Sequence, residues 1–166
     1  MKRLLDKIQQ TLDDNRQLFL DNDVKPVAHF DLFYNQPSMP TTMEWNCPAV
    51  FLDYMLDYDN ERAYIYLHCI YEDMEETDNA ELNRDYGLKY LTFLKLIKHL
   101  LKGLKTPPIF SALQLYQDSP MQSEYFHYHT ISFSCSLLDD LDDDFPKYIN
   151  VDLSDYTNNI KLKERL

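Results

Sequence analysis

Apolar residues near the start of the chain recur every three or four positions, with Lys, Asp and Gln between them. These apolar residues are Leu4, Leu5, Ile8 and Leu12. The spacing is typical of the buried face of an amphipathic helix. We therefore predict a helix over residues 2–14 that continues to about residue 20. Pro26 favours an extended conformation for the residue before it, so the helix ends before this position.

Short segments rich in β-branched and aromatic residues predict five strands. They cover residues 27–34, a segment that begins at Pro48, and residues 63–71, 109–116 and 125–138. The short connection at residues 57–62 makes the second and third strands an antiparallel hairpin. Apolar residues and histidine alternate with serine, threonine and tyrosine in the fifth strand, which indicates a half-buried antiparallel sheet. We expect QDSPMQSE, which precedes the fifth strand, to form a turn.

A second, longer helix is predicted over residues 80–102. Its expected apolar face consists of Leu88, Leu91, Leu94, Leu96, Ile97, Leu100, Leu101 and Leu104, and its expected solvent side carries Lys89, Lys95, Lys98, Lys102 and Lys105. Gly103 suits the left-handed conformation that ends many helices. The predicted fold is α+β: one domain with an antiparallel sheet of about five strands, in the order α-βββ-α-ββ, and helices packed on one face. We place this domain at residues 1–140 and an acidic, polar extension at residues 141–166.

The chain is strongly acidic. Its 166 residues include 16 Lys and Arg against 28 Asp and Glu, a net charge of −12. Such a surface repels phosphate backbones and anionic lipids, so we expect no specific nucleic-acid binding and no membrane partner. No apolar run approaches the ~20 residues of a membrane span, and we expect a cytoplasmic protein.

The low glycine content excludes several classes of enzyme site. Gly87 and Gly103 are the two glycines of the sequence, whereas phosphate-binding loops and the nucleophile elbow need several glycines close together.

The three cysteines are too few and too scattered for a disulfide framework or a thiolate zinc site. Cys47 precedes a proline and an apolar run, and we interpret it as the residue before a core strand. We therefore expect no enzyme, no cofactor and no small-molecule substrate.

Two further patterns imitate metal sites. His127 and His129 lie two residues apart on a predicted strand, so both side chains point to the same face. No further ligand follows at a suitable spacing, and His68 would join them only if the strand register placed it there. Asp140, Asp142 and Asp144 imitate the start of a calcium-binding loop, but Phe145 stands where the turn glycine is needed. We expect no metal at either place.

The acidic run itself is the candidate interaction surface. It consists of Asp139, Asp140, Asp142, Asp143 and Asp144. Like charges this close repel one another, so a folded monomer gains nothing by gathering them. The run is either a solvated chain segment or part of a surface that must be negative.

A resemblance to a known group of proteins rests on three features of the sequence. These are the order of elements, the segment Cys47-Pro48-Ala49-Val50-Phe51, and a final strand that ends in a short acidic stretch. The chain resembles small proteins of phage-derived elements of Bacteroidetes, a group similar in layout to the tail-completion, or tail-terminator, proteins of tailed bacteriophages. The resemblance covers about residues 1–140. It implies a structural protein that self-associates into a ring at the head–tail junction, contacts other tail or neck proteins and enters the virion if the phage is active.

Two other functions remain open from the sequence. An acidic adaptor or inhibitor would bind a basic host protein through its negative surface. A His-dependent metallohydrolase would use the histidines of the fifth strand. Three observations separate these functions. Ring formation would indicate the tail protein, a monomer that binds a basic partner would indicate the adaptor, and bound metal would indicate the metallohydrolase.

Overall fold

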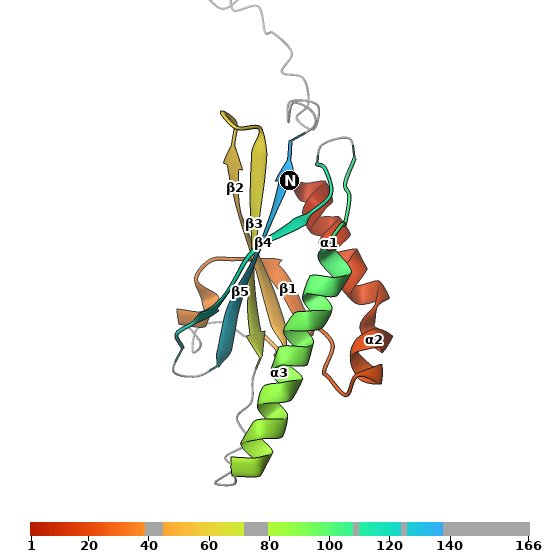
Figure 1. The fold of residues 1–166 in the computed structure, drawn as a ribbon, viewed down its shortest axis with the longest axis vertical. Coiled ribbons are helices and arrows are strands. Elements are labelled where there is room, and N and C mark those ends of the chain that lie inside the picture. The colour runs from red at the N-terminus through yellow and green to blue at the C-terminus, as the bar shows by residue number, and fades with distance from the viewer. Residues whose placement is uncertain (39–44, 72–79, 108–109, 124–125, 138–166) are drawn as a thin grey trace, which may run out of the picture.

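The computed structural model describes residues 1–38, 45–71, 80–107, 110–123 and 126–137, which form three α-helices and a five-stranded sheet (Figure 1). The elements in chain order are α1 (Lys2–Asp14), α2 (Arg16–Asp21), β1 (His29–Leu32), the short 3-10 helix η1 (Gln36–Ser38), β2 (Ala49–Asp57), β3 (Arg62–Tyr71), α3 (Ala80–Leu101), β4 (Gln114–Met121) and β5 (His127–Ser136). The predicted α+β class and the order of helices and strands are confirmed. The first helix is divided into α1 and α2 at Asn15.

The strands lie in the order β1-β2-β3-β5-β4, and the sheet is mixed. β2, β3, β5 and β4 pair antiparallel with their neighbours, and β2 and β3 form the predicted hairpin. β1, in contrast, pairs parallel with β2, so the expectation of a purely antiparallel sheet is wrong at this edge. Residues 33–48 connect the two strands, and a connection of about a dozen residues or more is long enough to return the chain to the start of a parallel neighbour.

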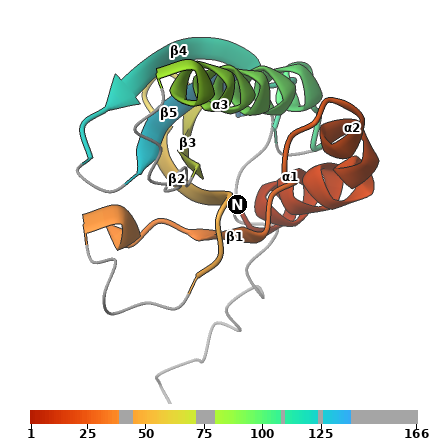
Figure 2. The same ribbon diagram turned by 90° about the horizontal axis from the view of Figure 1, so that it is seen from below.

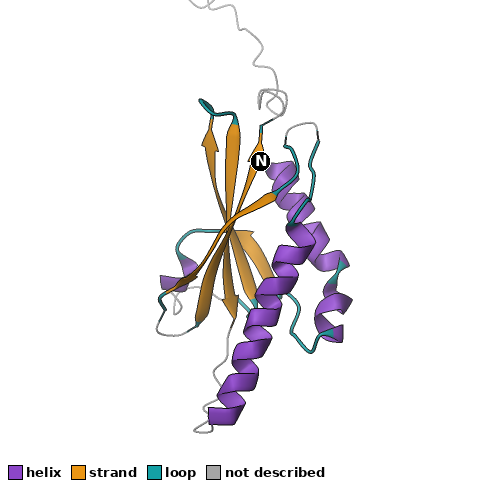
Figure 3. Ribbon diagram, in the orientation of Figure 1, coloured by secondary structure: helices purple, strands orange, loops and turns teal. Residues whose placement is uncertain are grey.

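The helices cover one face of the sheet, whereas η1 lies on the other side (Figures 2 and 3). The main core lies between the helices and this face. Its largest fully buried side chains include Phe19, Phe93 and Phe133. Phe93 contacts both Phe19 and Tyr71, with ring centroids 5.8 and 5.3 Å away, and so joins α2 and β3 to α3. Leu94 and Ile97 are buried, as predicted.

The predicted apolar face of α3 is wider than the one observed. Leu88 and Leu91 are exposed, against the prediction. Among the residues of α3 whose burial is described, the buried ones are Phe93, Leu94, Leu96, Ile97 and Leu101. Leu88 and Leu91 lie outside this buried face and so meet solvent despite their hydrophobicity. Gly103 follows the helix with φ at +86°, as predicted, and its N–H donates to the carbonyl of Leu113 at 2.8 Å.

The fourth strand lies later in the sequence than predicted. We expected a strand at residues 109–116 followed by a turn, but β4 begins at Gln114 and continues to Met121. Pairing with β5 overrides the turn preference of the sequence QDSP. The register shifts between Leu115 and Gln117, and Pro120 lies within the strand. Both features are tolerated because β4 is an edge strand.

Candidate functional site

The face of the sheet away from the helices carries an unusual set of residues. Partners in register share a face, so the alternation of β5 places Ser132, Ser134 and Ser136 on this side, as predicted. We name the part of this face toward the β2–β3 turn the open face. It consists of Asp53, Met55 and Asp57 of β2, Arg62, Tyr64 and Tyr66 of β3, Ser132, Ser134 and Ser136 of β5, and Gln114, Tyr116 and Gln117 of β4. None of the helices in the described part of the chain covers it (Figure 2).

Two tyrosines meet above the serines of the open face. Tyr64 on β3 and Tyr116 on β4 lie on either side of β5, yet their ring centroids are 5.5 Å apart. The rings reach each other because β5 carries only small side chains between them. As a result Ser134 is 6% exposed although none of the described helices packs on it, while Tyr116 is 60% exposed. The open face is therefore an aromatic surface above a row of small hydroxyl side chains.

The other half of the same face is covered by aromatic residues. Ala49, Phe51 and Ile70 form a second buried cluster, and Trp45 packs on Phe51 edge to face with the ring centroids 5.4 Å apart. Phe126 also contacts Trp45, at 5.3 Å. The expectation of a half-buried sheet with this face toward solvent is therefore wrong where the connection between β1 and β2 covers the face, and Ser132 and Ser134 of the open face are buried as well.

His68 lies at the border between the two halves. Its ring stacks on Phe33, with centroids 3.7 Å apart, and Nδ1 shares a hydrogen bond of 2.6 Å with the hydroxyl of Tyr128. Burial lowers the pKa of His68 to about 4, although the charge of Asp53 opposes this shift. The imidazole is therefore neutral at pH 7 and acts as a packed aromatic side chain.

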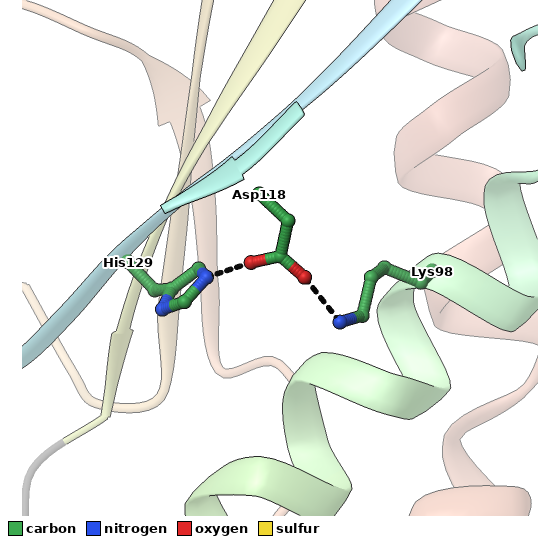
Figure 4. Close-up of polar contacts among 3 residues, drawn as sticks. All are labelled: Lys98, Asp118 and His129. Atoms are coloured by element: carbon green, nitrogen blue, oxygen red, sulfur yellow. Dashed lines mark hydrogen bonds and ion pairs between the residues drawn. The ribbon is translucent and has the colours of Figure 1, made fainter. Parts of the chain in front are cut away.

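The two histidines of β5 lie on the inner side of the sheet, where the alternation predicted them. His129 Nε2 contacts Asp118 Oδ1, and Asp118 Oδ2 contacts the ammonium group of Lys98 on α3 (Figure 4). His127 stacks instead on Tyr90, with ring centroids 4.9 Å apart. His68 pairs in register with Thr130, and both side chains lie on the face of the sheet opposite to His127 and His129. His68 therefore does not join the other two histidines. In the part of the chain that the structure describes, no group of three or more His, Cys, Asp and Glu is arranged to hold a metal ion.

The Lys98–Asp118–His129 cluster connects α3 to the edge strand β4. Burial alone would raise the pKa of Asp118, but the hydrogen bonds with Lys98 and His129 outweigh it and hold that pKa below its ordinary value. The thiol nearest in register is Cys69, the partner of His129 on β3. Cys69 is completely buried, and burial raises its pKa, so it remains a protonated thiol. The cluster thus stabilises the packing of α3 against the sheet and supplies no activated nucleophile.

The remaining predicted site residues divide into two groups. Cys47 and Pro48 come directly before β2, as predicted, and Cys47 packs against the second buried cluster. Cys69 and Cys135 are buried, as predicted. The acidic run at Asp139, Asp140, Asp142, Asp143 and Asp144 lies outside the described residues, as does the predicted extension at residues 141–166.

Sequence reasoning missed two features of the site. Lys98 was assigned to the solvent side of its helix, but it is half-buried against Asp118. Tyr64, Tyr66 and Tyr116 were not singled out, because their common surface arises from strands that are distant in sequence. The signal that could have pointed to them is the tyrosine content of the sequence, 13 residues, because tyrosine is enriched in protein interfaces, but this content does not show where an interface lies.

No family model, no curated protein and no solved structure matches this chain. Within the described residues, none of the helices has the length and apolar character needed to cross a bilayer.

Proposed function

We propose that the protein is a non-enzymatic structural protein that assembles into a ring, in the tail-completion or tail-terminator role at the head–tail junction of a phage or prophage particle. The sequence resemblance suggests the role, and the open face supports assembly. A tyrosine-rich surface that none of the described helices covers is the observation that carries the proposal, because aromatic residues are enriched where proteins bind one another. Such surfaces supply a large contact area at a low cost in side-chain entropy.

A closed ring needs two different surfaces on each copy, one that meets the preceding copy and one that meets the next. The open face provides one of them. Its central residues Tyr64 and Ser134 are partners in paired strands, and the ring of Tyr116 contacts that of Tyr64, so little ordering is needed when a partner binds.

The net charge of −12 also suits this role. DNA that moves through a ring must not adhere to it, and a negative inner surface repels phosphate groups. In the proposed ring, Asp139, Asp140, Asp142, Asp143 and Asp144 lie along or near the channel. Replacing Asp140, Asp142, Asp143 and Asp144 by Asn is expected to leave folding nearly unchanged and to impair particle completion or DNA passage. Normal infectivity of such a phage would assign the run to a solvated segment.

The assembly itself is tested by light scattering after size-exclusion chromatography, with negative-stain electron microscopy of the same fractions. We expect the purified protein to form ring-shaped oligomers, and Tyr64→Ser with Tyr116→Ser to reduce them to monomers. Leu91→Ser is the matched control, because Leu91 on α3 is 58% exposed, close to the 60% of Tyr116, but lies away from the open face. A wild-type protein that stays monomeric at high concentration, with or without other tail proteins, would contradict the proposal.

An acidic adaptor for a basic protein is the second candidate, and the charge of −12 is the observation that favours it. This function predicts a stable monomer whose affinity for a basic partner falls steeply with salt. Oligomeric state in solution therefore separates the two candidates before any partner is known.

A further inference from the structure

We propose that the open face binds the basic segment at residues 160–166, IKLKERL, of a neighbouring copy. The inference rests on the proposed assembly and names the contact that joins one copy to the next. Three features of the described residues carry it: the charge of the open face, the shape of its end at the β2–β3 turn, and the position at which the chain leaves β5.

The open face favours a cation. Asp53 and Asp57 lie along β2, and Arg62 is the single basic residue among those that define the face. Asp53 pairs in register with Tyr66, and the pKa of Tyr66 is raised, first by burial and then by the negative charge of neighbouring groups that include Asp53. Tyrosine rings beside carboxylates attract ammonium and guanidinium groups through both the ring face and the charge.

The end of the open face is hollowed. Met55, Leu56, Asp57, Tyr58 and Asp59 line an open hollow at the tip of the β2–β3 hairpin. Met55 and Tyr58 are exposed, and the two aspartates carry negative charge beside them. This combination accepts a segment that has both apolar and basic side chains.

Residues 160–166 have that composition in alternation. Lys161, Lys163 and Arg165 stand at every second position, and Ile160, Leu162 and Leu166 stand between or beside them, with Glu164 as the single acid. In an extended conformation alternate residues point to opposite sides. One side would then present three cations, in a chain whose overall charge is −12. The carboxylates of Asp53 and Asp57 make the open face complementary in charge to such a segment.

The chain leaves the described part beside the open face. The N–H of Leu137 donates to the carbonyl of Glu61 at 2.8 Å, which places the end of β5 at the β2–β3 turn. From Leu137 to residue 160 an extended chain spans up to about 76 Å at roughly 3.3 Å per residue. The ten residues of β5 span about 34 Å. The chain is therefore long enough for the segment to extend beyond its own sheet to the open face of a neighbour.

The test uses two full-length charge variants. The segment variant carries Lys161→Glu, Lys163→Glu and Arg165→Glu, and the face variant carries Asp53→Lys with Asp57→Lys. Each variant alone is expected to weaken self-association at least about tenfold, as the loss of several partly exposed ion pairs implies. A chain with both sets of substitutions should assemble again. An equimolar mixture of the two variants should assemble as well, because the intact segment of one meets the intact face of the other and the reversed segment meets the reversed face.

A peptide of residues 157–166 with an amidated end separates this inference from the proposed function. Titrated into the segment variant, it should bind, and Tyr116→Ser or Asp53→Lys should weaken it at least about tenfold, whereas Leu91→Ser should not. Absence of peptide binding overturns the inference whatever the oligomeric state. Rings that persist in all variants also overturn it and leave the assembly proposal standing. Failure of the mixture to assemble, with the peptide bound, shows that the segment occupies its own face and overturns the contact between copies.

Discussion

Truncation of Ile97 on α3 is the sharpest test of which helix face is buried. Ile97 has no exposed surface and belongs to the main core. Ile97→Ala removes three carbon groups, worth about 2.4 kcal/mol of transfer free energy at ~0.8 kcal/mol each. The cavity left behind adds to this, so we expect a total loss of about 2–5 kcal/mol. Leu91→Ala removes the same number of groups from a side chain that is mostly in solvent, and less than about 1 kcal/mol should be lost.

Urea unfolding measures both variants, followed by far-UV circular dichroism and by the fluorescence of Trp45. The two probes should give the same midpoint if unfolding is two-state, and the slope against urea should not change between the variants. The cost of each substitution is then read from the midpoints. A loss below about half a kcal/mol for Ile97→Ala, or equal losses for the two substitutions, would show that the assignment of the α3 face is wrong.

Three further predictions concern titrating groups. Because the pKa of Asp118 is lowered in the folded chain, its ionised form stabilises the fold above the ordinary carboxyl pKa. The wild type should therefore be more stable than Asp118→Asn, by at most about 1 kcal/mol for a partly exposed cluster. This difference should be constant above about pH 5 and disappear as the pH falls through the lowered pKa of Asp118. His68 has a pKa of about 4 in the folded chain, so as the pH falls below 6.5 its imidazole takes up a proton in the unfolded chain first. The wild type should therefore lose stability between about pH 6.5 and 4. This part of the loss should be missing in His68→Phe. A thiol reagent at about pH 8 should modify Cys47 before Cys69 and Cys135. Burial raises the pKa of both of the slower thiols, that of Cys135 to about 11. Prompt reaction of all three cysteines without urea would show that Cys69 and Cys135 are not buried.

Local patterns in the sequence predicted most of the elements. The helical spacing of residues 2–14 and the alternation along β5 are repeated over many positions, so both elements were placed within about two residues. The hairpin of β2 and β3 has a short connection that leaves few alternatives. Gly103 was assigned correctly because a left-handed residue after a helix is a local requirement.

The errors arose where a distant segment decides the structure. Nothing near β1 shows that it will pair parallel with β2, since that depends on the path of residues 33–48. The residues at 117–121 have turn preferences, and only the neighbouring β5 makes them a strand. Leu88 and Leu91 are as hydrophobic as their buried neighbours, and only the position of the sheet shows which leucines it covers.

The candidate site could be predicted less well than the fold, for the same reason. The contact between Tyr64 and Tyr116 joins side chains from β3 and β4 across a third strand, and the pairing of Lys98 with Asp118 joins a helix to a strand 20 residues later. Each residue is ordinary in its local sequence. The contacts between these residues depend on the strand order β3-β5-β4, which no local sequence pattern predicts.

The edges of the sheet limit how copies of this chain can meet. β1 is four residues long, and β4 combines a shifted register with Pro120, which has no N–H to donate. Growth of the sheet by addition of strands from other molecules needs a long, regular row of unpaired backbone groups, and neither edge offers one. Crowding such molecules at high concentration should therefore not lead to fibrils seeded at these edges. In the proposed assembly, association would instead pass through side chains, and its specificity would depend on a small number of tyrosines and charges that mutation can change one at a time.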